Sequence, residues 1–110
     1  MSYQHAELAA GRWSQLTFLE QMANIGSEVE RALNWRLKNH PLYSQRAFER
    51  ALELMDLTLE SIENPARLRE VARARELLVG FFLGTNEAAS TEASWRSYFS
   101  HFTHAARSQR

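Results

Sequence analysis

The feature that most constrains this chain is a pair of apolar stripes that break at Asn64-Pro65. Before the break, apolar side chains recur at intervals of three and four residues, at Phe48, Ala51, Leu52, Met55, Leu59 and Ile62. After it, a second set continues in the same manner, at Leu68, Val71, Leu78, Val79 and Phe82. This interval places each set on one side of an α-helix, whereas a β-strand needs strict alternation. Because the link is so short, the stripes predict antiparallel helices that pack face to face.

The residues around the break predict where these helices begin and end. The Asn64 side chain can accept the free backbone N–H groups of the following helix, and Pro65 suits the first helical position, which needs no donor. We expect Gly84 to stop that helix in a left-handed conformation, which glycine adopts without a steric penalty. Pro41 disfavours helical geometry in the residue before it, so a new helix is predicted to open there.

A further helix is predicted on the N-terminal side of this hairpin. From Trp13 to Leu37 the apolar residues share one broad face, with Ser14 as the expected cap. Gly26 lies on that face and, being small, marks a place where a neighbouring helix can approach closely. Residues 1–12 show no sustained period, so we expect them to form a mobile N-terminal arm.

The last helix is predicted after the polar loop TNEAAS. A cap at Ser90 or Thr91 precedes an aromatic stripe at Trp95, Tyr98, Phe99 and Phe102. Four helices with short links and no strand pattern predict an all-α, up-down four-helix bundle over residues 13–107.

Composition limits the functions open to the chain. Its 110 residues carry 13 Lys and Arg against 13 Asp and Glu, so no global field attracts nucleic acid or an anionic membrane. The lack of Cys excludes disulfides, thiolate metal sites and a Cys nucleophile. The longest apolar run, LLVGFFL, is far below the roughly 20 residues that span a bilayer. Because the N-terminus also lacks a signal-peptide pattern, we expect a cytoplasmic protein without a membrane partner.

Two arginines interrupt the apolar faces. Arg75 falls in the middle of its helix's apolar stripe, where an unpaired buried charge would be costly. In an up-down bundle, Glu28 and either Glu53 or Asp56 lie at about the same height. We therefore predict a buried ion pair that fixes the helix register. Arg36 also falls on the core side of its helix, and the alternative is that both arginines face a subunit interface.

Three apolar residues point away from the predicted core faces. Trp35 lies on one helix, and Leu54 and Leu57 lie on the next. Together they would form a contiguous apolar patch of the kind that marks an interface. We predict a homo-oligomer that associates through these residues, since closed symmetry is the usual arrangement of small bundles.

No motif in the chain indicates metal or cofactor chemistry. A di-iron bundle requires Glu-x-x-His on two helices, and this motif does not occur. His101-x-x-His104 has helical spacing, but two ligands are too few for a site and the two side chains point in different directions. No phosphate-binding loop, nucleophile elbow or His-Glu-x-x-His is present. We expect no metal and no cofactor.

Arginines cluster on the polar side of the helix that follows Pro65. Arg67, Arg69 and Arg73 recur there, and arginine binds phosphate groups in a bidentate manner. This row predicts a nucleic-acid contact, with RNA as the partner. The alternative is a mixed-charge solubilising face, because Glu70 and Glu76 lie among the arginines.

The segment Arg96-Ser-Tyr-Phe-Ser-His101 resembles the Arg-x4-His element near the last helix of HEPN-type ribonucleases, which are all-helical domains of similar length. The resemblance implies that Arg96 binds the phosphate while His101 acts as general acid or base on the ribose 2′-OH, across a dimer interface. Five helical residues put these two side chains about 140° apart, so only geometry can establish their roles.

Longer runs, among them LEQMANIGSEVERALNWRLK and RLREVARARELL, resemble a widespread family of small uncharacterised prokaryotic four-helix-bundle proteins. This resemblance covers most of the chain after Trp13 and implies no particular activity. The architecture is also loosely similar to bundle proteins encoded by ribosomal-RNA intervening sequences and to accessory proteins of diversity-generating retroelements. Those groups assemble as rings, and the retroelement proteins bind nucleic acid through a basic surface, whereas this chain is neutral overall.

Three alternative functions follow from these observations. The first is a non-enzymatic, oligomeric helical-bundle protein for interaction or assembly, such as an accessory factor on RNA or in a reverse-transcription complex. The second is a HEPN-like, metal-independent ribonuclease of a toxin or defence system, with Arg96 and His101 in its site. The third is an inert structural subunit of a larger complex.

Overall fold

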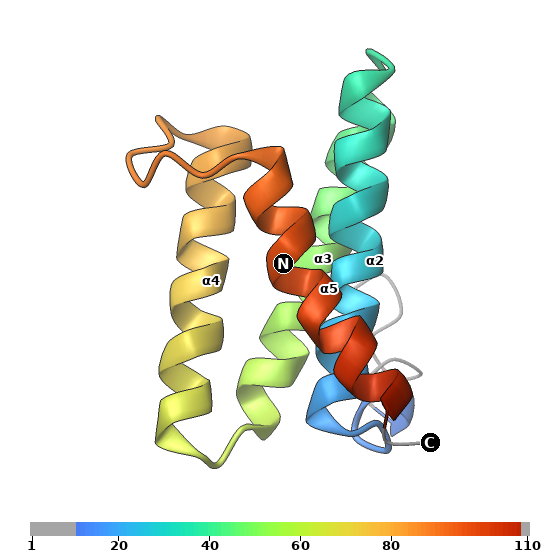
Figure 1. Cartoon of the computed structure of the whole chain (residues 1–110), viewed down its shortest axis with the longest axis vertical. Helices are drawn as coiled ribbons and strands as arrows, with labels where there is room; N and C mark the ends of the chain where they lie inside the picture. Colours follow the sequence, from blue (N-terminus) through green and yellow to red (C-terminus); the bar gives the residue numbers. More distant parts are fainter. Residues whose placement is uncertain (1–10, 109–110) are drawn as a thin grey trace.

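The computed structural model describes residues 11–108, and all regular structure in that range is helical. Four long helices follow one another there: α2 (Phe18–Leu37), α3 (Pro41–Ser61), α4 (Pro65–Leu83) and α5 (Glu92–Ser108) (Figure 1). The expected mobile arm lies outside the described residues except for residues 11 and 12, which are helical. None of the described helices combines the length and apolar character that a membrane crossing requires.

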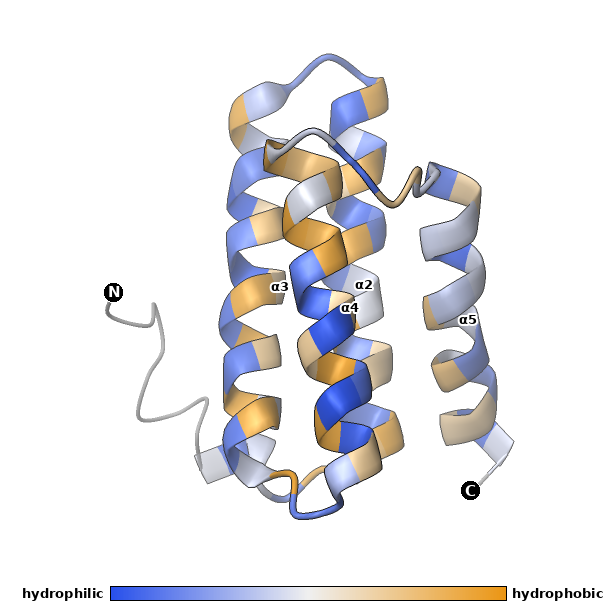
Figure 2. Cartoon of the chain, turned by 90° about the vertical axis from the view of Figure 1, so that its left-hand side faces the viewer, coloured by the Kyte–Doolittle hydropathy of each residue, from blue (hydrophilic) through white to orange (hydrophobic). Residues whose placement is uncertain are grey.

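The central helix of the arrangement is α2. It packs closely against both α3 and α5, while α4 approaches α3 more loosely and stands to one side (Figure 1). In the view from that side, α4 lies in front and α5 lies at the far edge (Figure 2). The turn at 38–40 and the loop at 84–91 lie at the same end of the molecule, and the turn at 62–64 lies at the other (Figure 1).

The helix starts predicted around the prolines and the last loop are confirmed. Pro41 and Pro65 open α3 and α4. Asn64 Oδ1 accepts hydrogen bonds from the two backbone N–H groups that follow Pro65, at 2.9 Å and 3.1 Å. At the start of α5, the backbone N–H of Ser94 donates to Thr91 Oγ1 at 3.0 Å, and the backbone N–H of Thr91 donates to Ser94 Oγ at 2.9 Å.

The predicted start of the first long helix is wrong. Helix α2 begins at Phe18 rather than near Ser14. The reason is a capping box: the backbone N–H of Glu20 donates to the Thr17 hydroxyl, and the backbone N–H of Thr17 donates to the Glu20 carboxylate. Two free N–H groups are thereby satisfied at Thr17, so the helix begins there.

Gly84 ends α4 in a different manner from the one predicted. Its φ is −109°, which is not left-handed, and its N–H donates to the carbonyl of Gly80 at 3.0 Å. The chain enters the left-handed region later, at Asn86 and Ala89, with φ of 53° and 54°. The loop therefore turns at its middle rather than at the end of the helix.

The core lies between the four helices, each of which contributes buried residues. Gly26 is confirmed as a point of close approach, because a Cβ built on it would lie 2.7 Å from Phe99 Cβ of α5. The buried indole of Trp13 donates a hydrogen bond to the Thr58 hydroxyl of α3 at 2.8 Å. The largest fully buried side chains are Met22, Ile25, Leu33, Met55, Leu78, Val29, Val71 and Thr58.

Helix α4 contributes fewer buried residues to this core than α2 or α3. Its buried residues are Val71, Ala74 and Leu78, whereas α2 and α3 each have more buried residues, spread over most of their length. Leu68, which the sequence placed in the apolar stripe, is 41% exposed. The apolar residues of α4 gather in its last turns, which are coloured as hydrophobic in Figure 2. The described part of the chain is thus all-α, with three closely packed helices and a fourth at the side.

Candidate interaction surface

Arg75 of α4 contacts one of the carboxylates predicted for it. Its Nε lies 2.8 Å from Asp56 Oδ1, outside good hydrogen-bond alignment, and its Nη2 donates to Asp56 Oδ2 at 3.3 Å. The predicted burial of this pair is wrong, because the two side chains are 30% and 34% exposed. Glu28 takes no part in it and pairs with Arg31 and Arg50 instead. The physical reason is that α4 stands away from α2 and leaves Arg75 at the edge of the core.

The predicted interface residues do not form one exposed patch. Leu57 is buried at 8% exposure, and Leu54 is partly buried against the core. Leu57 belongs to the same buried cluster as Trp13, a residue before α2 whose indole bonds to Thr58 of α3. Trp35 is partly exposed at the far end of α2. These three residues therefore do not form a single surface through which two copies could associate.

The arginines predicted to contact RNA are all exposed on α4 but differ in their surroundings. The guanidinium of Arg67 lies over the Phe18 ring, 4.6 Å from its centroid. Arg73 forms an ion pair with Glu76 at 3.3 Å. Arg69 has no ion-pair partner among the described residues. Glu76 offsets part of the charge of this row, and RNA binding by it stays a prediction.

Arg96 and His101 do not share a hollow. Arg96 joins α5 to α2, where it donates to Glu30 Oε1 at 3.0 Å and to Asn34 Oδ1 at 2.9 Å. A hollow of about 460 Å³ beside it is lined by His104, whereas His101 is exposed and outside that lining. Across residues 11–108, no group of three His, Asp or Glu side chains is placed to hold a metal ion. A meeting of Arg96 and His101 across two copies stays a prediction.

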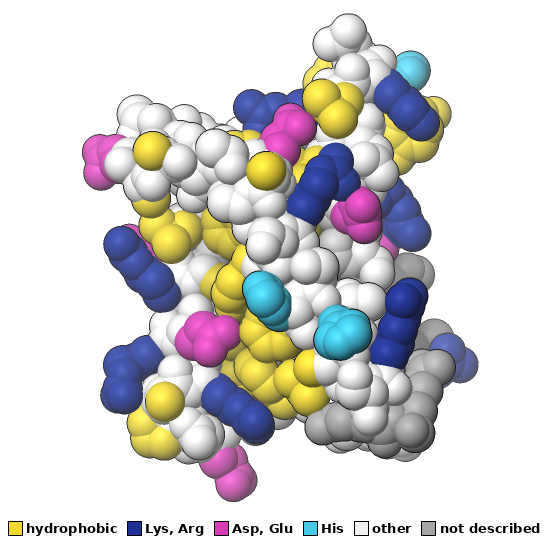
Figure 3. Space-filling model, in the orientation of Figure 1, with side chains coloured by type: hydrophobic (Ala, Val, Ile, Leu, Met, Phe, Trp, Pro, Cys, Tyr) yellow, Lys and Arg dark blue, Asp and Glu magenta, His cyan; other side chains and the backbone are white. Residues whose placement is uncertain are grey.

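Large apolar side chains are exposed chiefly at one end of the molecule. Leu37 ends α2, Leu42 and Tyr43 begin α3, and Leu83 ends α4, with exposed fractions of 62%, 57%, 47% and 68%. We call these four residues the apolar end. In the space-filling view, the protruding turn at this end shows apolar and basic side chains together (Figure 3). Among the described residues, the only other large apolar side chain exposed in this way is Leu68, near the opposite end.

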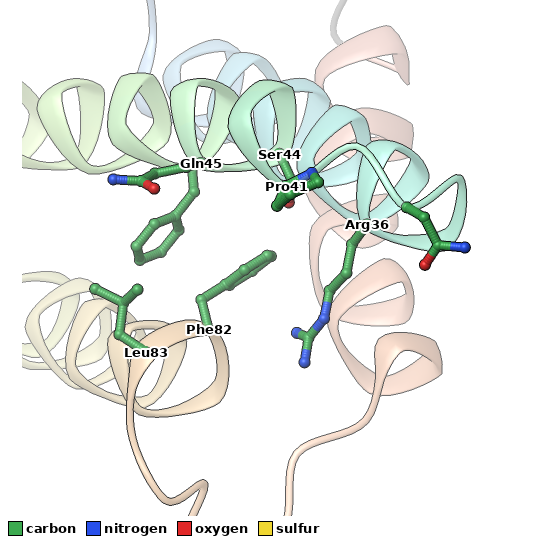
Figure 4. Close-up of a pocket in the computed structure, with 8 residues that line it drawn as sticks. Arg36, Pro41, Ser44, Gln45, Phe82 and Leu83 are labelled. Carbon is green, nitrogen blue, oxygen red and sulfur yellow. The ribbon is translucent and has the colours of Figure 1, made fainter.

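A hollow of about 570 Å³ opens at the apolar end, between the start of α3 and the last turn of α4. Phe48 and Phe82 line it, with their rings stacked 4.6 Å apart between centroids. Arg36 extends from α2 toward the same space, and Leu83 borders it (Figure 4). The volume is typical of ligand-binding pockets, which are mainly apolar with a few polar groups.

The stretch around the turn at this end carries an excess of positive charge, and one residue of that stretch, Arg36, lines the hollow. From residue 31 to residue 48 the chain has no Asp or Glu, and Arg36, Lys38 and Arg46 are exposed within that stretch. Arg31, in the same stretch, pairs with Glu28. The protein is neutral as a whole, so this local excess of positive charge reflects how charges are distributed along the chain.

Aromatic rings hold the basic side chains of this end in place. The Arg36 guanidinium carbon lies 5.0 Å from the centroid of the Phe81 ring and 5.6 Å from that of Phe82. Lys38 Nζ lies 5.3 Å from the centroid of the Trp35 ring. Such cation–π contacts orient a cation while leaving its N–H groups able to bind an anion.

A second apolar groove, of about 340 Å³, lies between α4 and α5 (Figure 3). The Tyr98 hydroxyl donates to Glu70 Oε2 at 2.9 Å across it. Burial, together with the hydrogen bond to Glu70 and its negative charge, raises the pKa of Tyr98 above the ordinary value of 10.0. The indole N–H of Trp95 is buried with no hydrogen-bond partner among the described residues. The hydrogen bond between Tyr98 and Glu70 therefore attaches α4 to α5 across this groove.

The apolar end was not predicted from the sequence, although the sequence contains a signal for it. Leu37, Leu42 and Tyr43 flank the Pro41 turn, in a stretch without acidic residues. Leu83 could not be added to them from the sequence, because only the fold brings the end of α4 beside this turn. No protein-family model, curated protein or solved structure matches the chain, so the family resemblances stay predictions.

Proposed function

We propose that this chain is a helical interaction protein that binds another protein through its apolar end. The observation that carries the proposal is the coincidence of exposed large apolar residues, an apolar hollow and positive charge at one end of the molecule. Exposed apolar side chains beside an apolar hollow, with charged residues nearby, are typical of protein interaction sites. In this proposal α2 to α5 are a scaffold, an up-down four-helix bundle with α4 loosely attached.

The surroundings of Arg96 favour this function over the ribonuclease alternative. Both branches of its guanidinium are engaged by Glu30 and Asn34, so Arg96 fastens α5 to α2. His101 does not line the hollow beside it. The apolar end, by contrast, has side chains that no part of the described chain covers.

The partner in this proposal differs from the chain itself. A two-fold contact between two apolar ends would bring Arg36 and Lys38 of both copies into one interface. Like charges that face each other in a protein interface weaken binding, at a cost on the order of several kcal/mol. The expected homo-oligomer would therefore need another surface, and light scattering during size exclusion would detect it.

Capture of partners by three forms of the protein tests the proposal. Immobilised wild type, the double variant Leu37→Ser/Leu83→Ser and the control Leu68→Ser are each exposed to an extract of the source cells. All three positions are exposed, so the variants should fold, which circular dichroism and thermal melting would verify. We expect one set of proteins on the wild type and the Leu68 variant that the double variant does not retain.

The result that contradicts the proposal is equally specific. If the double variant captures the same proteins as the wild type, the apolar end is not the interaction surface. If Leu68→Ser alone loses the partners, the interaction surface lies at the opposite end of the molecule.

A further inference from the structure

We propose that the hollow beside Arg36 recognises a carboxylate carried one helical turn from a large apolar side chain, so that the occupant is an acidic amphipathic helix of the partner protein. This inference rests on the proposed function, because it names the chemistry of the partner that the apolar end binds.

The first step of the argument concerns Arg36. Among the described residues it has no ion-pair partner, although Arg31, Arg50, Arg75 and Arg96 all have one. Its guanidinium instead lies over two rings of α4 at the mouth of the hollow. A guanidinium held in this way keeps a planar set of donors that matches a carboxylate in a bidentate manner.

The second step concerns the other polar groups of the hollow, most of which are already used. The Ser44 hydroxyl donates to the carbonyl of Ala32 at 2.8 Å, and the Gln45 amide donates to Glu49 Oε1 at 3.0 Å. Of the side chains that line the hollow, Arg36 carries the charge, while Asn39 and the second amide N–H and carbonyl of Gln45 can also bind a polar group. A ligand with one anionic group and an otherwise apolar contact surface fits the groups that line the hollow.

The third step concerns the apolar contacts. The stacked rings of Phe48 and Phe82 line the hollow, and Leu83 borders it. Leu37 and Leu42 are exposed on either side of the turn at 38–40, which contributes Asn39 to the lining of the hollow. An amphipathic helix places residues at i and i+4 on one face, about 6 Å apart, and such helices bind in apolar grooves. One apolar side chain in the hollow and a second on the leucines would leave an acidic residue between them within reach of Arg36.

The nature of the exposed surface favours a protein over a nucleic acid. Binding of single-stranded nucleic acid without sequence preference uses aromatic faces on which bases stack. Leu37, Leu42 and Leu83 have no such faces. Of the aromatic residues here, Trp35 and Tyr43 are packed against each other at 4.9 Å between centroids. Three of the four residues of the apolar end are therefore aliphatic, and Tyr43 is the aromatic one.

Fluorescence anisotropy with a designed peptide tests the inference. The probe is a labelled helical peptide of about 15 residues, a length at which isolated helices become stable, with Leu at i and i+4 and Glu at i+3. A matched peptide has Gln in place of that Glu. We expect wild type to prefer the Glu peptide by about tenfold, which corresponds to about 1.4 kcal/mol. Arg36→Gln should remove this preference, and the exposed control Arg69→Gln should keep it.

Each other outcome has a definite meaning. If both peptides bind equally, or if Arg36→Gln weakens both to the same degree, the carboxylate assignment is wrong, while the proposed function stands as long as the Leu37/Leu83 variant loses its captured proteins. If neither peptide binds wild type, the acidic-helix inference is overturned. Arg36-dependent binding of a labelled uridine oligonucleotide or of phosphatidylglycerol vesicles, without binding of the Glu peptide, would show that the occupant belongs to another class.

Discussion

Helices α2 and α4 have similar apolar stripes in the sequence but very different surroundings in the structure. In α2 the buried residues run from Gln21 to Leu33, because α3 covers one side of the helix and α5 covers another. In α4 only Val71, Ala74 and Leu78 are buried. The comparison teaches that a stripe shows which side of a helix faces the protein, while its coverage depends on how many neighbours approach.

A small number of side-chain contacts attach α4 to the rest of the molecule. The stacking of Phe82 on Phe48 joins its last turn to α3. The ion pair of Arg75 joins its middle to α3, and the hydrogen bond from Tyr98 to Glu70 joins it to α5. The hollow at the apolar end and the groove at α5 both lie beside this loosely covered helix.

The largest expected difference concerns leucines of the two helices. Leu33 of α2 is fully buried, so Leu33→Ala should lower the free energy of unfolding by about 2–5 kcal/mol, the usual range for a buried leucine. Leu77 of α4 is only partly buried, and Leu77→Ala should cost about 1 kcal/mol. Urea unfolding followed by circular dichroism measures both. Equal losses would mean that Leu77 is packed as closely as Leu33 in solution.

Two glycines sharpen the comparison. A Cβ at Gly26 would lie 2.7 Å from Phe99 Cβ, so Gly26→Ala must push α5 away from α2. Overpacking of this kind costs about 1–3 kcal/mol, partly offset by the better helix propensity of alanine. At Gly80 of α4 nothing lies within 4 Å of such a Cβ, and Gly80→Ala should stabilise the protein by about 0.5–1 kcal/mol.

The same urea-unfolding measurement tests whether Gly26→Ala lowers the free energy of unfolding and Gly80→Ala raises it. A Gly26→Ala variant as stable as the wild type would show that α2 and α5 are further apart than described. Destabilisation by Gly80→Ala would show that α4 has a close neighbour at this position.

The raised pKa of Tyr98 leads us to expect a loss of stability at alkaline pH. Its pKa is raised in the folded protein, so the unfolded chain releases this proton first as the pH rises. The contribution of protonated Tyr98 to the free energy of unfolding is complete below pH 10.0. It decreases above this pH, by at most about 1.4 kcal/mol per pH unit. Tyr98→Phe should flatten this decrease, whereas Tyr43→Phe, at an exposed position, should not.

Urea unfolding between about pH 8 and about pH 11 measures this slope, across the range where a tyrosine titrates. Lys38 is the only lysine of the chain, so few other side chains titrate in this range. An unchanged slope in Tyr98→Phe would mean that Tyr98 is not held between α4 and α5.

The smallest expected effect concerns the ion pair of α4. The side chains of Arg75 and Asp56 are about a third exposed, so water screens their attraction. A double-mutant cycle with Arg75→Gln and Asp56→Asn should give a coupling energy of about 0.5 kcal/mol, which should fall as salt is added. A coupling of about 2 kcal/mol or more would indicate a pair buried in the core, as the sequence predicted.

The sequence predicted the helices better than the site. Asn64 and Pro65 act on their own neighbours, so their effect on the chain can be read locally. The pairing of Arg75 with Asp56 could be anticipated from helix height, but its exposure could not. Arg36 was recognised as unusual, yet the rings beside it belong to α4 and are about 45 residues away, a separation that no local pattern reports.

By itself, the sequence determined that this chain is helical and where most of its helices break, because side-chain spacing, capping residues and prolines act within a turn or two of backbone. Only the tertiary structure decided which apolar residues are covered. Leu57 looked exposed but is buried beside the segment that holds Trp13, and Leu83 continues an apolar run but is 68% exposed. The physical reason is that burial depends on how closely distant segments approach, and that distance is set by the packing of the whole chain.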